Sequence, residues 1–106
     1  MSAERLFERR WALALLEQAR RRLRKEYVEA GKSELHEELK AFESGDKGAP
    51  PYAEVAARLG LSESAMKSAV FRLRQRYREL VREEIAHTVL SPTEIDEEIK
   101  YLIGVI

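Results

Sequence analysis

The sequence predicts an all-α protein: a small helical bundle with a helix-turn-helix motif and a C-terminal helical extension. Two observations predict this class. Apolar residues recur at helical spacing over most of the 106 residues. Residues 52–80 then contain a short amphipathic stretch, a glycine turn and a long basic stretch, which is the order of a helix-turn-helix. We expect one domain over residues 1–90, with the motif as its core, and an extension over residues 91–106.

Two amphipathic helices are expected before the motif. The first covers residues 3–30 and should end at Gly31, which adopts the left-handed conformation readily. Its apolar stripe consists of Phe7, Trp11, Leu15, Leu16, Ala19, Leu23 and Tyr27. The second should start near Ser33, whose hydroxyl would cap the first turn, and end by Gly45. Its apolar face consists of Leu35, Leu39 and Phe42.

The motif itself is marked by residues that start and stop helices. Residues 44–51 are loop-rich, and their two prolines should lead into a short helix from Tyr52 to Leu59. Gly60 should stop that helix, and Ser62 should cap the next one, which is predicted to run unbroken to His87.

Charge is sorted along the chain although the formal net charge is zero. Residues 1–26 and 62–82 are basic, whereas residues 27–61 and 83–106 are acidic. Such local fields persist over a Debye length of roughly 8–10 Å. Residues 91–106 are predicted to form an acidic helix with an apolar stripe, which begins with a capping box at Ser91. This helix either completes the core or folds back and competes with phosphate for the basic face.

The long basic helix is expected to have two distinct faces. At about 100° per residue, Met66, Val70, Leu73 and Tyr77 fall on a narrow arc that should face the core, with Ala69 and Leu80 at its edge. The opposite face should contact solvent or a ligand. It carries Ser68, Phe71, Arg72, Gln75, Arg78 and Arg82, flanked by Lys67 and Arg74.

Phe71 is the informative residue of the polar face. An exposed aromatic ring among arginine, serine, lysine and glutamine is unfavourable on a surface without a partner. In a DNA major groove, however, the ring can contact a thymine methyl group while Arg or Lys reads guanine. The alternative is that Phe71 packs beneath the first long helix, and its exposure distinguishes the two.

Residues 52–85 resemble region 4 of bacterial sigma factors, and most closely the extracytoplasmic-function (ECF) group of the sigma-70 family. The resemblance rests on Tyr-Ala-Glu-Val-Ala-Ala-Arg-Leu-Gly-Leu-Ser, which begins at Tyr52, and on Met-Lys-Ser-Ala-Val-Phe-Arg-Leu-Arg, which begins at Met66. Residues 4–12 and 82–89 are similar to the segments that flank region 4 in this group. The resemblance implies a fold of the sigma region 4 type, which is winged-helix-like.

The resemblance also implies partners and contacts. In the family this domain recognises the −35 element of double-stranded promoter DNA and docks on the flap of the RNA polymerase β subunit. Carried over by position, base and backbone contacts fall on Lys67, Ser68, Phe71 and Arg72, with Ser62, Ser64 and Arg74 as further backbone candidates. The site set expected to bind DNA also includes Gln75 and Arg78 from the polar face. An anti-sigma factor is a further candidate partner.

The chain differs from a complete ECF factor. Nothing in the sequence corresponds to region 2, which binds the −10 element in complete ECF factors. We therefore expect a fragment, or a protein that cannot start transcription alone. The alternative function is a helical protein-interaction module that holds polymerase or an anti-sigma factor and contacts DNA weakly.

Catalytic chemistry is not expected. The sequence has no phosphate-binding glycine loop and no nucleophile elbow, and its adjacent glutamate pairs diverge on a helix. Cysteine is absent, which removes disulfides, zinc fingers and thiol chemistry. His36 and His87 are expected to be surface or boundary residues and not metal ligands, so we expect no cofactor and no small-molecule substrate. Neither a signal peptide nor an apolar run of about eighteen residues is present, which predicts a cytoplasmic protein without membrane contact.

Overall fold

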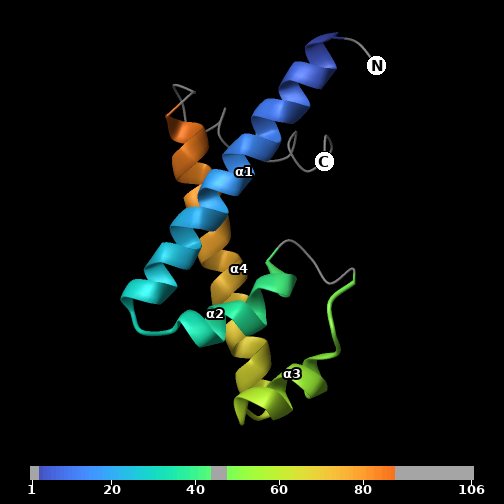
Figure 1. Ribbon diagram of the computed structural model, residues 1–106, viewed down its shortest axis with the longest axis vertical. Helices are drawn as coiled ribbons and strands as arrows, with labels where there is room; N and C mark the ends of the chain where they lie inside the picture. The colour runs from blue at the N-terminus through green and yellow to red at the C-terminus, as the bar shows by residue number, and fades with distance from the viewer. Residues whose placement is uncertain (1–2, 44–47, 88–106) are drawn as a thin grey trace. The chain divides into compact units, whose positions relative to one another are not determined.

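The computed structural model describes residues 3–43 and 48–87, with side chains described from residue 9 onward. Within these residues the chain forms four α-helices and one 3₁₀ turn (Figure 1). They are α1 (Ala3–Glu29), α2 (Ser33–Leu39), η1 (Lys40–Phe42), α3 (Tyr52–Leu59) and α4 (Glu63–Ala86). This part of the chain contains no strand, so the all-α prediction is confirmed and no β-hairpin wing occurs there. The helix predicted at 91–106 lies outside the described residues.

The chain divides into two compact units. The first unit comprises residues 1–22 and 78–106, and the second comprises residues 23–77. Each described part of a unit has its own buried apolar side chains. Those of the first unit are Ala12, Leu15, Leu16, Ala19, Leu80, Val81 and Ile85. Those of the second are Leu23, Leu39, Phe42, Val55, Ala56, Met66, Ala69, Val70, Leu73 and Tyr77.

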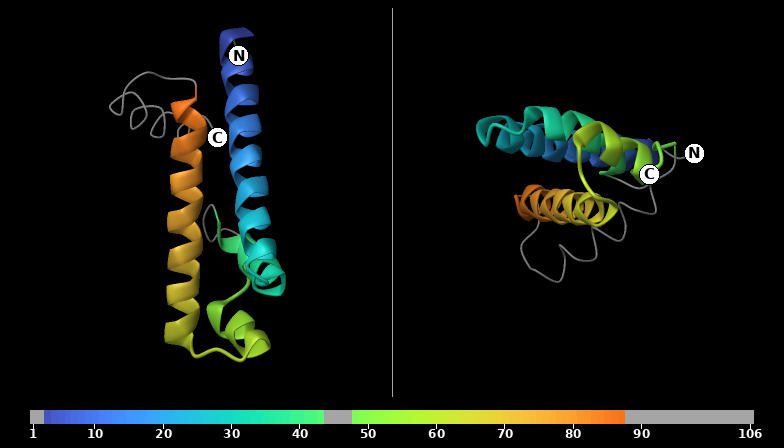
Figure 2. Two further views of the ribbon diagram at one scale, coloured as in Figure 1. Left: turned by 90° about the vertical axis from the view of Figure 1, so that its left-hand side faces the viewer. Right: turned by 90° about the horizontal axis from the view of Figure 1, so that it is seen from below.

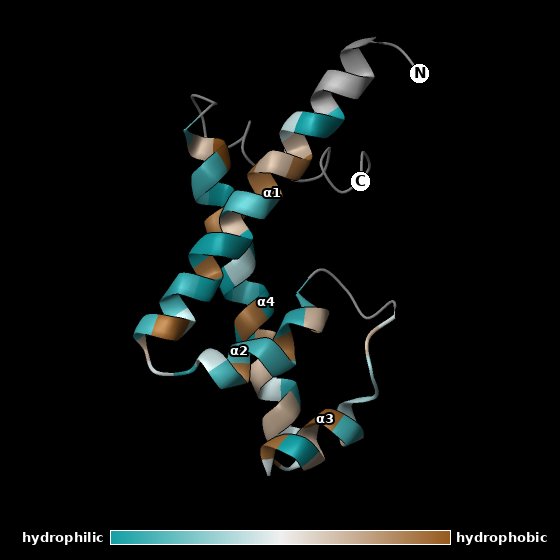
Figure 3. Cartoon of the chain, viewed as in Figure 1, coloured by the Kyte–Doolittle hydropathy of each residue, from teal (hydrophilic) through white to brown (hydrophobic). Residues whose placement is uncertain are grey.

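The apolar stripe predicted for α1 is confirmed where side chains are described. Leu15, Ala19 and Leu23 are buried, while Trp11 and Tyr27 are half-buried. Colouring by hydropathy shows hydrophobic residues recurring among hydrophilic ones along the coloured part of this helix (Figure 3). The predicted position of Phe7 in the stripe stays a prediction, since its side chain lies outside the described set.

The turn after α1 forms as predicted, but the start of α2 does not. Gly31 adopts a left-handed φ of +74°, and the N–H of Lys32 donates to the carbonyl of Tyr27 at 2.8 Å. This tight turn leaves only Lys32 to precede α2, so Ser33 is already the first helical residue. Lys32 is the N-cap and makes no side-chain cap bond. The prediction that Ser33 caps this helix is therefore wrong.

The helix-turn-helix forms with the caps that the sequence predicts. Pro51 (φ −59°, ψ 144°) precedes α3, and Gly60 ends it with a left-handed φ of +69°. The N–H of Leu61 then donates to the carbonyl of Ala56 at 2.9 Å. Ser62 caps α4, because its Oγ accepts the N–H of Ala65 at 3.1 Å. From Glu63 onward α4 runs without a break, as Figure 2 shows.

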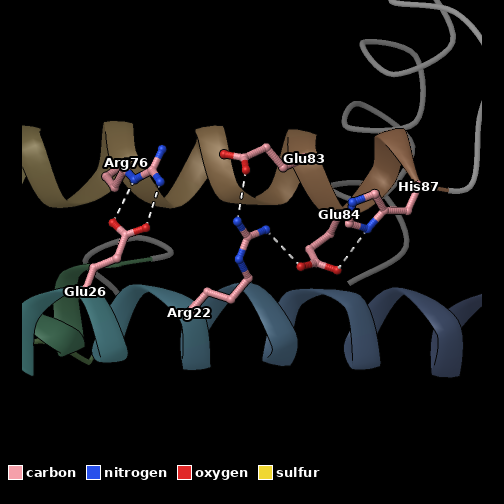
Figure 4. A network of polar contacts seen from close by, with 6 residues as sticks. All are labelled: Arg22, Glu26, Arg76, Glu83, Glu84 and His87. Carbon is pink, nitrogen blue, oxygen red and sulfur yellow. Dashed lines mark hydrogen bonds and ion pairs between the residues drawn. The ribbon is translucent and has the colours of Figure 1, made fainter. Parts of the chain in front are cut away.

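An ion-pair network links α1 and α4 inside the first unit (Figure 4). Arg22 donates to Oε1 of Glu83 at 2.9 Å and to Oε1 of Glu84 at 3.0 Å. Hydrogen bonds to these two carboxylates raise the pKa of Arg22 above its ordinary value. Glu84 also lies 4.0 Å from Nδ1 of His87. The guanidinium thus donates to both carboxylates at once. Such networks contribute more to stability than isolated surface ion pairs do.

Candidate nucleic-acid interface

The core-facing side of α4 is the one that the helical wheel predicts. Met66, Val70 and Leu73 are at most 1 % exposed, and Tyr77 is 7 % exposed. Ala69 and Leu80, placed at the edge of the arc, are also buried. The side of α4 opposite these buried residues therefore faces the surface.

Seven of the predicted site residues lie exposed on the second unit, and together they define what we call the recognition face. They are Ser62, Ser64, Lys67, Ser68, Phe71, Arg72 and Gln75. Four of them, Ser64, Ser68, Phe71 and Gln75, follow each other at spacings of three or four residues, which aligns them along one side of a helix. Arg78 and Arg82 are exposed as well but belong to the first unit.

Phe71 is strongly exposed in a polar neighbourhood. Its exposed fraction is 66 %, against 50 % for Val28 and 42 % for Leu13, the other large apolar side chains that stand out at the surface of the described residues. The alternative in which this ring packs beneath the first helix is wrong. The residues next to it on the face are polar or basic, so its exposure is not the edge of a larger apolar core.

Arg74 departs from the rest of the predicted set. Its side chain is half-buried, and its Nε donates to the carbonyl oxygen of Phe42, the last residue of η1, at 2.7 Å. That carbonyl lies at the end of a short helical segment, where carbonyls lack helical partners. The structure therefore places Arg74 in the framework of the second unit, and the recognition face does not include it.

A second arginine of α4 has a framework contact that the sequence did not predict. Arg76 binds Glu26 of α1 through two bonds, Nε to Oε1 at 2.8 Å and Nη2 to Oε2 at 2.7 Å (Figure 4). A two-pronged pair of this kind fixes orientation as well as distance. The two residues are 50 positions apart, so no local sequence signal could have paired them.

The helix-turn-helix is joined to α2 in a similar way. Nε of Arg58 in α3 donates to Oε2 of Glu38 in α2 at 3.0 Å, and its Nη1 donates to Glu54 at 3.4 Å. The rings of Phe42 in η1 and Tyr52 in α3 meet edge to face with centroids 5.0 Å apart. These contacts hold α3 against the preceding helices of the same unit.

Charge on the recognition face comes from Lys67 and Arg72. Nζ of Lys67 lies 3.8 Å from Oε1 of Glu63, one turn earlier in α4. Arg72 is close enough to Tyr27 to act on its hydroxyl: burial raises the pKa of Tyr27, and the positive charge of Arg72 offsets part of that rise. Both cations therefore have neighbours in the protein while their side chains stay exposed.

His36 is not at the surface, which corrects the prediction for this residue. It is 4 % exposed, and its Nε2 lies 3.3 Å from Oε1 of Glu43. Its ring also lies 5.5 Å from that of Tyr27. The reason is the helical spacing of α2, which places position 36 on the same inward side as Leu39. His87 is exposed, as predicted.

The described residues offer neither a metal-binding cluster nor a membrane-spanning helix. Over residues 3–43 and 48–87, no group of three or more His, Cys, Asp or Glu residues is arranged to hold a metal ion. The same residues include no helix with the length and apolar character needed to span a membrane. No family model, curated protein or solved structure matches this chain.

Proposed function

We propose that residues 52–80 form a DNA-binding helix-turn-helix, and that the chain acts as the −35-recognition domain of an ECF-type sigma factor. The observation that carries the proposal is the exposure of Phe71 among the polar and basic side chains of the recognition face. A solitary exposed phenylalanine in that setting has no folding benefit, whereas a thymine methyl group in a major groove offers it an apolar contact.

The local architecture supports insertion of α4 into the groove. A major groove about 12 Å wide admits one α-helix, and in helix-turn-helix proteins the N-terminal part of the second helix contacts the base edges. That part of α4 holds Ser64, Lys67 and Ser68, and all three are exposed. Ser62 can still contact a phosphate, because its oxygen accepts from Ala65 while its O–H remains a donor.

The framework contacts support a preorganised reading helix. Arg76 with Glu26, and Arg74 with the Phe42 carbonyl, attach α4 to earlier elements of the second unit. A reading helix held in this way loses less conformational freedom on binding, and that loss is one of the costs of association. The recognition face is thus presented by a helix whose opposite side is buried and tied down.

Docking on the polymerase β flap belongs to the same proposal. It rests on the likeness of residues 52–85 to sigma region 4, and no residue is assigned to it. The mechanism for DNA is more definite: α4 enters the major groove, Phe71 and Arg72 contact base edges, and basic side chains contact phosphates. The phosphate contacts provide affinity and salt dependence, and the base-edge contacts provide sequence choice.

The test is a pair of substitutions with matched controls. We expect Phe71→Ala and Arg72→Ala each to weaken binding to a selected duplex by ~1–3 kcal/mol, because each removes a base-edge contact. Val28→Ala and Arg24→Ala are the controls, since they remove an exposed apolar and an exposed basic side chain from α1. Fluorescence anisotropy measures the affinities, with duplexes selected from a random library.

Two outcomes would contradict the proposal. If the Phe71 and Arg72 variants bind like the wild type, α4 does not read the groove through this face. If the wild type selects no sequence but binds polymerase or an anti-sigma factor, the protein-interaction module is the correct function.

A further inference from the structure

One acidic side chain lies at the start of the proposed reading helix. From Ser62 to Arg78 the sequence contains a single acidic residue, Glu63, and it is the first residue of α4. Its side chain is 68 % exposed, and its Oε1 lies 3.8 Å from Nζ of Lys67. The resemblance to sigma region 4 placed no contact at this position.

A carboxylate here has two opposite effects. It stabilises the helix, because the N-terminal end carries a partial positive charge. On a surface that approaches DNA it is also repelled by phosphate. A carboxylate can nevertheless be accommodated at a base edge that presents a donor, and in the major groove acidic side chains accept from the amino group of cytosine.

The position of Glu63 in α4 favours contact with a base edge over proximity to a phosphate. Residues 63, 64, 67 and 68 are the exposed ones in the first turns of α4, and the N-terminal residues of a recognition helix are those that reach the bases. Glu63 and Lys67 are separated by four residues, or about 6 Å along the helix axis. Base pairs are about 3.4 Å apart, so these two side chains can address base pairs one or two steps apart.

We propose that Glu63 is a specificity-determining residue that selects cytosine in the major groove. In the free protein its carboxylate pairs with Lys67. On the correct site the carboxylate accepts a hydrogen bond from the cytosine amino group, and Lys67 turns to a guanine one or two steps away. Guanine and thymine offer no amino donor in the major groove, and adenine places the acceptor N7 beside its amino group, which disfavours a carboxylate. On other sequences Glu63 therefore lacks this contact and repels phosphate, so the same side chain lowers affinity for non-specific DNA. This inference rests on the proposed DNA-binding function.

Selection from a random duplex library tests the inference. The proteins are the wild type, Glu63→Ala, Glu63→Gln, and Glu37→Gln as a control. Glu37 is exposed and bonds to Lys40 of η1 at 2.7 Å, so its substitution removes the same charge and a similar lysine pair outside the helix-turn-helix. Circular dichroism verifies that each variant is folded.

We expect the wild type and the control to enrich cytosine at one position. Glu63→Ala should lose that preference by roughly 5- to 150-fold and bind random-sequence duplex more tightly. Glu63→Gln should shift the preference to adenine, which a carboxamide contacts through two bonds.

The outcomes separate this inference from the function on which it rests. If the wild type selects a sequence and Glu63→Ala keeps the same preference at every position, the role of Glu63 is overturned while DNA binding stands. If the wild type enriches no sequence, the proposed function fails and the inference fails with it.

Discussion

Three arginines at alternate positions of α4 meet three different environments. Arg72 is exposed on the recognition face, Arg74 donates to the carbonyl of Phe42, and Arg76 is paired with Glu26. All three lie within the same basic stretch of sequence, so the local composition does not distinguish them. What separates them is a partner 32 or 50 residues away, and local periodicity carries no information about such partners.

Substitution of Arg74 tests its framework role. We expect Arg74→Ala to lower the free energy of unfolding by ~1.5–3 kcal/mol, because a charge-assisted hydrogen bond to a helix-end carbonyl is lost. The control is Arg78→Ala, an exposed arginine of the same helix, which should change stability by less than about 0.5 kcal/mol. Urea denaturation measures both. A stable Arg74→Ala protein whose DNA binding depends less on salt would instead identify Arg74 as a phosphate contact.

The ends of single helices are predictable from the sequence where the signal lies within one turn of chain. Gly60 and Ser62 end one helix and cap the next as predicted, and α4 runs unbroken over its predicted length. The prediction failed at Ser33, because only Lys32 lies between the left-handed Gly31 and the first residue of α2, so Lys32 takes the N-cap position. The predicted second helix also changes to 3₁₀ geometry at Lys40 and ends at Phe42, which its apolar spacing does not reveal.

The turn of the helix-turn-helix permits a test at this scale. A Cβ added at Gly60 would meet open space, so the cost of Gly60→Ala comes from its positive φ alone. We expect a loss of ~1–2 kcal/mol in the free energy of unfolding, and a smaller loss for Gly60→Asn, since asparagine tolerates this conformation. Thermal unfolding followed by circular dichroism measures the loss. Equal stability of the alanine and asparagine variants would show that the left-handed turn is not retained in solution.

For the whole molecule, the fold class and the exposed side of α4 were predictable from the sequence. The contacts between elements far apart in the sequence were not. Helical spacing was enough to predict which side of α4 is buried and which is exposed. It could not predict that the chain divides into two units, nor that Arg74 and Arg76 contact residues outside α4. Both depend on where separate helices meet, and the sequence of one helix does not specify its neighbour. The function of the recognition face stays a prediction.

At the scale of the whole molecule, the net charge does not indicate whether the protein can bind DNA. The formal net charge is zero, so DNA affinity must come from the local basic residues. We expect the logarithm of the binding constant to fall linearly with the logarithm of salt concentration, and Arg78→Ala to reduce that slope by about one without altering base preference. Val28→Ala serves as the uncharged control. Affinity that does not change between low and high salt would contradict phosphate binding.

The division of the chain has a consequence for the order in which the protein can form during synthesis. The second unit is one continuous segment, residues 23–77, so all of it is available once residue 77 has emerged from the ribosome. The first unit is made of two separate segments, residues 1–22 and 78–106. Leu15, Leu16, Leu80 and Ile85 are all buried in it, so its buried core cannot be complete until residues 80–85 have been made. Proteins fold domain by domain as they are made, the earlier part first. Here the segment made first completes its packing last.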